Sequence, residues 1–564
     1  MENEINPQSA DSHGSAVSHA SLQRKIGWQG AFWVASGVPA LVLFSMGGIS
    51  ATVGKPAWII WMVSIMFGFI QSFTYAEIAG LFPNKSGGAS IYGAAAWVRY
   101  SRFIAPVSVW CNWFAWSPVL AIGSGLVAGY ILTALFAPDA AINTWQITLA
   151  DLSGVKEGLE LRINATFLLG AAVLLIVFAI QHGGILRSAK TMTILGIAAL
   201  LPLMLVGIVP IVTGDLPSAH FFPLKPLAYD EAGAVIDGVW NFDGWMLMAG
   251  GLFIAAWSTY GFETAVCYTR EFKDPKRDTF KAILYSGLLC IAVFTLVPIA
   301  FQGHLGLGEM VTPAVTDAEG NVTTAAVYSG MLAPEVYSGM GIANVLSGIL
   351  GGNKVIGAIM VIMLILSLTL SIMTSMSGSS RTLYQASVDG WLPKYLSHVN
   401  KHGAPTRAMW TDLGFNLILL MMSDYMFILA AANVGYIIFN FLNLNAGWIH
   451  RMDRAKWDRP YRAPTLLLAA GAILGYVNVT LMGLGANIWG AGTLTAGLIF
   501  ASLIIPVFIF RHYIQDKGVF PKAMLDDLYF SGNEEGVSKR AGVLPYLALL
   551  AGIALAYWTH SLVS

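Results

Sequence analysis

Long apolar runs separated by short polar breaks dominate this chain of 564 residues. Each run has roughly 18 to 25 residues, the length that an α-helix needs to cross the hydrocarbon core of a bilayer. Hydrophobic residues make up 56% of the chain, charged residues make up 11%, and the mean hydropathy is +0.66. A soluble domain of this length does not have such a composition. The chain is therefore predicted to be an all-α polytopic membrane protein.

The runs predict about thirteen transmembrane helices, each with ends uncertain by several residues. They cover residues 30–53, 56–80, 103–136, 164–181, 191–213, 245–269, 281–301, 353–384, 407–423, 425–448, 463–485, 489–511 and 541–561.

Basic residues provide an internal test of this map, because short cytoplasmic loops are rich in Lys and Arg. With the N-terminus in the cytoplasm, 26 of the 31 Lys and Arg residues fall on the cytoplasmic side. The five that remain outside are Lys55, Lys156, Arg162, Lys225 and Lys354. This separation predicts a multi-pass protein of a plasma or inner cell membrane, with a cytoplasmic N-terminus.

Several function classes are disfavoured by composition. The 31 basic and 31 acidic residues balance, which provides no basic surface for a nucleic acid partner. Cys111, Cys267 and Cys290 lie in apolar segments, with no CxxC pair and no His at metal-ligand spacing. We therefore expect no metal site and no cofactor. Because no His, Cys and Ser constellation gathers on one side of the membrane, we do not expect an enzyme.

The sixth predicted helix contains a carboxylate, Glu263, directly after the small and polar run Ser258-Thr259-Tyr260-Gly261. An acidic residue inside an apolar span normally faces the protein interior or a watery path. Gly261 also allows the backbone to unwind in mid-membrane. The first predicted helix, five spans earlier, contains Ser45-Met46-Gly47-Gly48-Ile49-Ser50. Two broken helices in corresponding positions indicate an inverted repeat, although Gly47-Gly48 also fits close packing between helices.

Three groups of motifs occur in a characteristic order. They are Tyr75-Ala76-Glu77-Ile78-Ala79 with Phe82-Pro83 and Ser86-Gly87-Gly88 through Tyr92, then Tyr260-Gly261-Phe262-Glu263 with Asp274-Pro275-Lys276-Arg277, then Ser380-Arg381-Thr382-Leu383-Tyr384 with Asp389-Gly390-Trp391-Leu392-Pro393. Over about residues 30–512 the chain resembles the amino acid, polyamine and organocation (APC) permeases.

The resemblance implies an inverted five-helix repeat (LeuT-like) transporter fold with substrate between helices 1, 3, 6, 8 and 10. The expected domains are a disordered cytoplasmic tail at 1–28, a transport core at 29–448, two further helices at 449–512, and a cytoplasmic loop with an extra C-terminal helix at 513–564.

The resemblance also implies a substrate site. Met46, Gly47 and Gly48 would surround a substrate carboxylate, and Ser258 with its neighbours would offer carbonyls to an amine. Trp257 matches an aromatic gate of arginine-exchanging relatives, and Trp116 replaces a polar residue, which argues against an arginine-sized cation. The expected substrate-binding residues are Met46, Gly47, Gly48, Trp116, Trp257, Ser258, Tyr260 and Gly261.

Ion coupling is left open by the resemblance. Proton-coupled members carry a Lys on helix 5, and Gly196 stands at that position here. The absence of that Lys leaves sodium coupling, exchange and facilitated uptake open, and the coupling ion is expected to be H⁺ or Na⁺. Ser371, Thr374 and Ser375 on helix 8 are candidate ion ligands. Their alternative role is to bond back to their own helix.

Glu77 and Glu263 are expected to have gating or structural roles. Glu77 lies near the cytoplasmic end of helix 2, where an ion pair with a basic loop is favoured over contact with the substrate. Glu263 is interpreted as a clamp on the broken backbone of helix 6, with proton carrier or amine counter-ion as its alternatives.

The leading hypothesis is a secondary active transporter that imports a small amino acid or related amine by alternating access. The alternatives are an exchanger of polyamines or biogenic amines and, from another class, a membrane sensor without transport activity. A sensor would need an attached signalling domain, and neither the tail nor the 513–540 loop is large enough for one.

Overall fold

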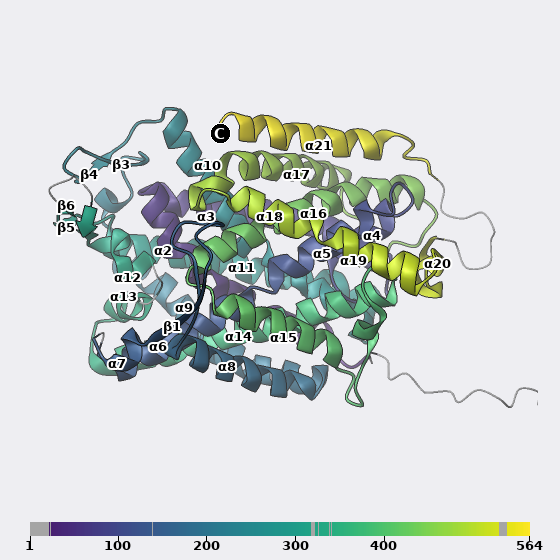
Figure 1. Ribbon diagram of the computed structural model, residues 1–564, viewed down its shortest axis with the longest axis horizontal. Helices are drawn as coiled ribbons and strands as arrows, with labels where there is room; N and C mark the ends of the chain where they lie inside the picture. Colours follow the sequence, from purple (N-terminus) through teal and green to yellow (C-terminus); the bar gives the residue numbers. More distant parts are fainter. Residues whose placement is uncertain are drawn as a thin grey trace, which may run out of the picture.

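The computed structural model describes residue 22 and residues 24–137, 139–316, 322–324, 326–337, 339, 341–528 and 539–563. The main helices form a bundle (Figure 1). The α-helices are α1 (Trp28–Ala35), α2 (Val42–Val53), α3 (Ala57–Gly80), α4 (Ala89–Trp97), α5 (Ile104–Trp116), α6 (Val119–Leu135), α7 (Ala141–Thr144), α8 (Ala165–His182), α9 (Ile185–Thr213), α10 (Phe242–Thr259), α11 (Pro275–Leu305), α12 (Pro334–Tyr337), α13 (Ile342–Ile349), α14 (Lys354–Val388), α15 (Thr406–Leu420), α16 (Tyr425–Asp453), α17 (Thr465–Gly485), α18 (Thr493–Ser502), α19 (Ile504–Ile509), α20 (Lys522–Leu528) and α21 (Leu544–Ser561).

Tighter and wider helical segments connect or extend these helices. The 3₁₀ segments are η1 (Val38–Leu41), η2 (Ser218–His220), η3 (Gly261–Glu271), η4 (Gly330–Leu332), η5 (Lys394–Ser397) and η6 (Ala486–Trp489), and η7 (Phe510–Gln515) is a π-helix.

Within the described residues, ten helices are long and apolar enough to cross a membrane. Three more segments coincide with the remaining predicted spans: α10 with η3, the 15-residue α15, and the 18-residue α21. The structure therefore confirms a mostly helical membrane protein. The count of thirteen, the inverted repeat and the orientation stay predictions.

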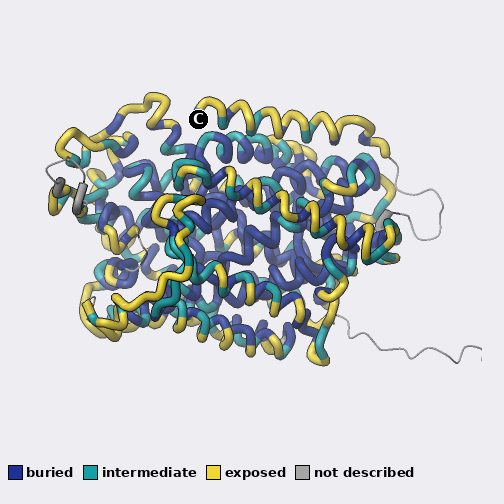
Figure 2. Tube along the Cα trace, in the orientation of Figure 1, coloured by how far each residue is buried: buried dark blue, intermediate teal, exposed yellow. Residues whose placement is uncertain are grey.

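Burial separates central helices from peripheral ones. In both Trp28–Val53 and Tyr425–Asp453, 89% of the most apolar window is buried, compared with 33% in Ala165–His182 and in Thr493–Gln515. Figure 2 shows the same gradient, with buried segments in the middle of the bundle and exposed turns along α21. α21 packs along α17 at one edge (Figure 1). The central helices are thus the first and tenth predicted spans.

The first predicted span is broken, but at another place than the sequence predicts. α1 ends at Ala35, η1 follows from Val38, and α2 then runs unbroken through Met46, Gly47 and Gly48. The prediction of a break at Ser45–Ser50 is wrong. Ser36 and Gly37 separate the two helices, and Pro39 in η1 lacks the N–H that a continuous helix would use.

The sixth predicted span is broken where the sequence predicts. α10 ends at Thr259, and the chain continues from Gly261 as the 11-residue 3₁₀ segment η3. A 3₁₀ run of this length is uncommon and often marks a functional hinge.

Four short antiparallel hairpins occupy the predicted outer loops. The strands are β1 (Gln146–Asp151), β2 (Glu160–Asn164), β3 (Leu227–Tyr229), β4 (Val235–Asp237), β5 (Met310–Thr312), β6 (Val315–Thr316), β7 (Val322–Thr324) and β8 (Val327–Tyr328), paired as β1–β2, β3–β4, β5–β8 and β6–β7. The sequence analysis does not predict these strands.

Most of the predicted tail at 1–28 lies outside the described residues. Its last part is ordered, because Ile26 bridges Phe272 and accepts a hydrogen bond from the Lys273 N–H at 2.8 Å. These contacts attach the segment before α1 to the residues that follow η3.

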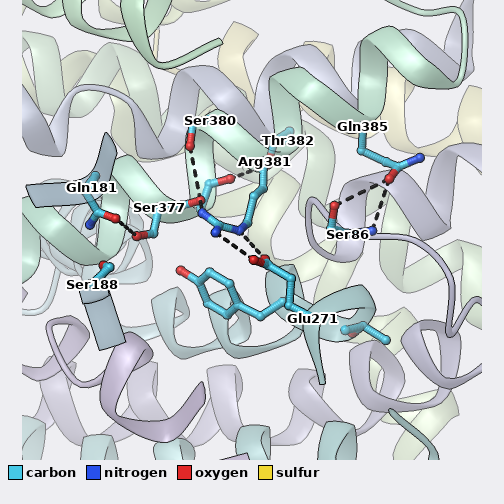
Figure 3. A network of polar contacts seen from close by, with 12 residues as sticks. Ser86, Gln181, Ser188, Glu271, Ser377, Ser380, Arg381, Thr382 and Gln385 are labelled. Atoms are coloured by element: carbon cyan, nitrogen blue, oxygen red, sulfur yellow. Dashed lines mark hydrogen bonds and ion pairs between the residues drawn. The ribbon is translucent and has the colours of Figure 1, made fainter. Parts of the chain in front are cut away.

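A buried ion pair joins η3 to α14 at the end of the bundle that is predicted to face the cytoplasm, here named the inner end. Arg381 forms a two-pronged pair with Glu271, with Nη2 3.0 Å from Oε1, and its Nη1 donates to the Ser377 carbonyl at 2.9 Å. Figure 3 shows both charged side chains pointing toward each other beside Gln181, Ser377 and Ser86. Both side chains are buried, so either charge would lie in an apolar environment without a counter-charge if its partner were removed.

A second buried pair, Lys85–Asp389 at 2.7 Å, joins the loop after α3 to the end of α14. Gln385 supports it by donating to Asp389 Oδ1 at 2.9 Å and by accepting from the Ser86 N–H at 3.3 Å. The inner end is therefore closed by two charge pairs.

We expect Arg381→Met to destabilise the protein by about 3–5 kcal/mol, because it leaves the Glu271 carboxylate buried without a partner. Lys276→Met is the matched control, since Lys276 and Asp458 form an exposed pair with 64% and 72% of their side chains accessible. An exposed pair of this kind contributes little to stability, because water and salt screen the two charges. Thermal unfolding in detergent measures both, and equal losses of stability would contradict the prediction.

Candidate functional site

The two broken helices meet at their breaks. Ser258, one residue before the end of α10, donates its hydroxyl to the Leu41 carbonyl of η1 at 3.3 Å. Its Oγ also lies 3.4 Å from the Ser45 Oγ of α2. Leu41 is the N-cap residue of α2, so this side-chain bond ties α10 to the backbone at the start of α2.

Four aromatic side chains surround this meeting point: Phe44, Trp116, Trp257 and Tyr436, here named the aromatic cluster. The Trp257 ring lies 5.8 Å from Phe44 and 6.5 Å from Trp116, and Trp116 meets Tyr436 edge-on at 6.0 Å. Trp257 is 1% exposed, and its indole N–H donates to the Ala115 carbonyl at 2.9 Å. The cluster gives the site an apolar, closed interior.

Gly261 lets the aromatic cluster reach the break of α10 and η3. A Cβ at this position would overlap the Trp116 ring, so the indole packs directly on the glycine backbone. On the other side, Ser375 of α14 donates to the Trp116 carbonyl. Trp116 thus links α5 to both η3 and α14.

Glu263 is buried two residues after Gly261 on η3, and it bonds to another helix. Its Oε1 accepts the Trp116 indole N–H at 3.0 Å, whereas Oε2 has no hydrogen-bond partner among the described residues. A buried oxygen without a partner needs a physical explanation, because its desolvation is unfavourable. This contact ties η3 to α5, and the predicted clamp on its own broken backbone is not among the bonds the structure gives it.

Tyr260 directs its hydroxyl toward α17. It donates to Asn478 at 3.0 Å, and Asn478 in turn donates to Asn440 at 2.9 Å. Asn440 bonds Gln71 and the Tyr75 hydroxyl, both at 2.6 Å. Tyr260 therefore joins the helix break to α3, α16 and α17.

Met46, Gly47 and Gly48 do not lie at the break. Met46 is buried in α2, a Cβ on Gly47 would overlap the Val336 carbonyl, and one on Gly48 would come within 3.0 Å of Met426. These glycines permit close packing on neighbouring segments, which is the alternative that the sequence left open. The break of the first span lies instead at Ser36–Leu41, between α1 and α2.

The three candidate ion ligands on α14 bond across helices. Ser371 donates to the Gly37 carbonyl and Thr374 to the Val34 carbonyl, each at 2.7 Å, and Ser375 donates to Trp116. Ser371 Oγ also lies 3.2 Å from the Ser367 carbonyl of its own helix, the bond that the sequence left as its alternative role. Thr369, in contrast, bonds back to Ile365. Ser371 and Thr374 therefore satisfy carbonyls at the break of the first span.

Gly196 on α9 lies against the same break. A Cβ there would come within 2.7 Å of the Trp33 ring and 3.0 Å of the Ser36 hydroxyl. The position where proton-coupled APC permeases carry a Lys is thus closely filled by α1.

Glu77 lies at the inner end and forms ion pairs. Arg451 donates to both of its oxygens, at 2.9 and 2.6 Å, Arg459 lies 3.3 Å away, and the Ala463 N–H donates at 2.8 Å. Burial lowers the pKa of Arg459, and the negative charge of Glu77 acts in the opposite direction by raising this pKa. Glu77 is therefore a structural ion-pair centre between α3 and the α16–α17 loop.

Sequence reasoning missed the residues that form the first break. Ser36-Gly37 followed by Pro39 is a turn signal that could have located it. A Cβ on Gly37 would overlap the Leu370 carbonyl and Thr374, so only glycine lets α14 approach this closely. Phe44 and Tyr436 carried no signal, because apolar aromatic residues are common throughout the spans.

The chain is similar to known permeases and transporters. Residues 26–509 match the family model described as amino acid permease. An uncharacterised transporter of Legionella pneumophila is 23% identical over 69% of this chain and 71% of its own length. A branched-chain amino acid permease of Lactococcus lactis is 22% identical over 71% of this chain and 76% of its own length. A chloroplastic cationic amino acid transporter of Arabidopsis thaliana is 22% identical over 53% of this chain and 48% of its own length.

These relatives are transporters, not enzymes, as the sequence predicts. The family match covers both broken spans and the aromatic cluster. It confirms the resemblance to the APC permeases, and the chain belongs to the amino acid permease family.

Proposed function

We propose that this protein is a secondary active transporter that moves a small amino acid across a cell membrane by alternating access. The observation that carries the proposal is the meeting of two helix breaks at the buried aromatic cluster, linked by the Ser258–Leu41 bond. Broken helices at mid-membrane offer backbone groups to a polar solute while the rest of the bundle stays apolar.

The two breaks suit the two charges of an amino acid. No side chain caps the N-terminus of η1, and a helix N-terminus attracts a carboxylate. The C-terminal end of α10 presents carbonyls, which attract an ammonium group. The apolar side chain would then contact Trp116 and Trp257. The branched-chain specificity named for the Lactococcus relative is in keeping with such a site.

Alternating access would require the inner end to open. Glu271 on η3 and Asp389 at the end of α14 are held by Arg381 and Lys85. Separation of these pairs would free η3 to move about Tyr260–Gly261, where the helix is already interrupted. We infer that they form the gate on the predicted cytoplasmic side.

The coupling ion in this proposal is H⁺ or Na⁺. A sodium ion between α1 and α14 would take oxygen ligands from Val34, Gly37, Ser371 and Thr374. It would have to replace the two direct hydrogen bonds that now join these groups.

A second candidate function is exchange of polyamines or biogenic amines. The observation that favours it is the Glu263 Oε2 atom, which has no hydrogen-bond partner within the described part of the chain. An ammonium group could supply one. The cationic amino acid transporter among the relatives is in keeping with this alternative.

Uptake into proteoliposomes is the first test. A panel of labelled amino acids and amines is offered under an imposed proton gradient, a sodium gradient or none. We expect accumulation of a small zwitterion with one of the two gradients. Uptake only into vesicles preloaded with amine would replace this proposal with the exchanger.

Trp257→Ala and Ser258→Trp test the site itself. We expect kcat/KM to fall about tenfold or more, since a buried aromatic side chain contributes at least about 1.5 kcal/mol through its contacts. Ser258→Trp also removes the bond to Leu41 and fills the meeting point. Trp245→Ala is the control, because Trp245 lies on the same helix and is 58% exposed. Unchanged kinetics at normal surface expression would remove Trp257 and Ser258 from the site.

Glu263→Gln separates the two candidate substrates, because glutamine keeps an acceptor for Trp116 but loses the charge. An amine should lose about tenfold or more in affinity, as a hydrogen bond to a charged group contributes about 1.5–3 kcal/mol. A zwitterion held at the helix breaks should keep its KM within about threefold. Exposed Glu157→Gln is the control. A large loss for a zwitterion would assign Glu263 to its amine.

A further inference from the structure

A second carboxylate, Asp412 of α15, is fully buried next to the site. Its Oδ1 accepts the Trp113 indole N–H at 2.8 Å and the Ser117 hydroxyl at 2.6 Å. Asn416, one turn later, donates to Ser117 at 2.7 Å and so fixes the direction of that hydroxyl. Oδ1 is therefore held as an acceptor by two donors.

The other carboxylate oxygen of Asp412, Oδ2, forms a hydrogen bond with the Ser379 hydroxyl of α14. Oδ2 lies 2.5 Å from the Ser379 hydroxyl, and the same hydroxyl lies 2.8 Å from the Ser375 carbonyl. A serine hydroxyl has one proton and cannot donate to both acceptors. If Asp412 is ionised, the Ser379 hydroxyl donates to Oδ2, and the Ser375 carbonyl receives no hydrogen bond from it. If Asp412 carries a proton on Oδ2, that proton is donated to Ser379, which then donates to Ser375.

The carboxylate receives only neutral donors. Glu77, Glu271 and Asp389 are also buried, but each pairs with Arg or Lys. An ionised carboxylate inside a membrane protein is unfavourable without a cation, and binding a proton removes that penalty.

The elements packed against α15 include α14, α6, α8 and η5, and most of their titratable side chains have other described partners. Tyr384 of α14 interacts with Arg270, and Lys354 lies at the far, N-terminal end of the same helix. Arg381 bonds Glu271, Tyr130 bonds the Gly339 carbonyl, His182 contacts Asn400, Lys394 pairs with Asp516, and Tyr395 bonds Thr411. None of these contacts competes for the carboxyl group of Asp412.

The groups around Asp412 reach the aromatic cluster by two routes. The Ser375 carbonyl gains or loses the hydrogen bond from Ser379. The hydroxyl of the same residue donates to the Trp116 carbonyl. Trp113 lies one turn before Trp116 on α5. The protonation state of Asp412 is thus linked to the hydrogen bonds that hold Trp116 between α5 and α14.

We propose that Asp412 is the proton-binding residue that couples transport to a proton gradient. This inference rests on the proposed transport function. A proton from the aqueous phase binds Oδ2, and the Ser379 hydroxyl proton turns from Oδ2 to the Ser375 carbonyl. Release of the proton on the opposite side reverses both steps, so one proton crosses with each cycle.

The test uses the full chain in proteoliposomes, with the amino acid that it transports and a pH-sensitive dye inside the vesicles. For one coupled proton, a gradient of one pH unit supports about tenfold accumulation. Asp412→Asn keeps the shape and the hydrogen-bonding capacity but cannot bind or release the proton. We expect accumulation and proton entry to be lost in this variant, while exchange of labelled for unlabelled substrate persists.

Ser379→Ala is the second variant, in case Asp412→Asn fails to fold. It should lower proton-driven accumulation and leave exchange intact. Ser380→Ala is its matched control, because the neighbouring hydroxyl bonds only to backbone of its own helix.

The outcomes separate the two proposals. A wild-type protein that transports no amino acid overturns the proposed function. A wild-type protein that transports without response to the proton gradient overturns the role of Asp412 alone. Wild-type accumulation in Asp412→Asn, or in Ser379→Ala where Asp412→Asn is unfolded, overturns it as well.

Discussion

The structure depends on one constraint: backbone groups inside a bilayer must find hydrogen-bond partners within the protein. Unbroken helices meet it internally, whereas the break of the first span also uses side chains of neighbouring helices. There, Ser371 donates to the Gly37 carbonyl, Thr374 to the Val34 carbonyl and Ser258 to the Leu41 carbonyl. Both breaks lie in the buried centre of the bundle, where neighbouring helices can supply such partners.

Small residues decide how closely the helices approach this centre. Gly37 admits α14, Gly261 admits the Trp116 ring, and Gly196 admits Trp33. Each contact would be blocked by a Cβ, so the closed site depends on backbone surfaces as much as on aromatic side chains. Under the proposed function the same contacts would separate when substrate enters, because the aromatic cluster now fills the space between the breaks.

Five of the buried carboxylates differ in their partners. Glu77, Glu271 and Asp389 lie at the inner end and pair with Arg or Lys, which favours a fixed charge and a structural or gating role. Glu263 and Asp412 lie beside the aromatic cluster and accept hydrogen bonds from neutral groups. Neutral donors stabilise a charge less than a cation does, so these two groups are the ones suited to exchange a partner or a proton during transport.

Length and hydropathy of the apolar runs determined the membrane class and most helix positions, because a span must be apolar over its whole length wherever it packs. Local motifs also located the second break, since Gly261 follows a polar run, and placed Glu77 in an ion pair beside basic loops. The first break was misplaced because Gly47-Gly48 and Ser36-Gly37 look alike in sequence, and only packing distinguishes a contact glycine from a hinge. The aromatic cluster and the partners of Asp412 come from spans far apart in the chain. Their proximity was decided by the tertiary structure alone, because helix rotation and neighbour choice depend on contacts that no single run encodes.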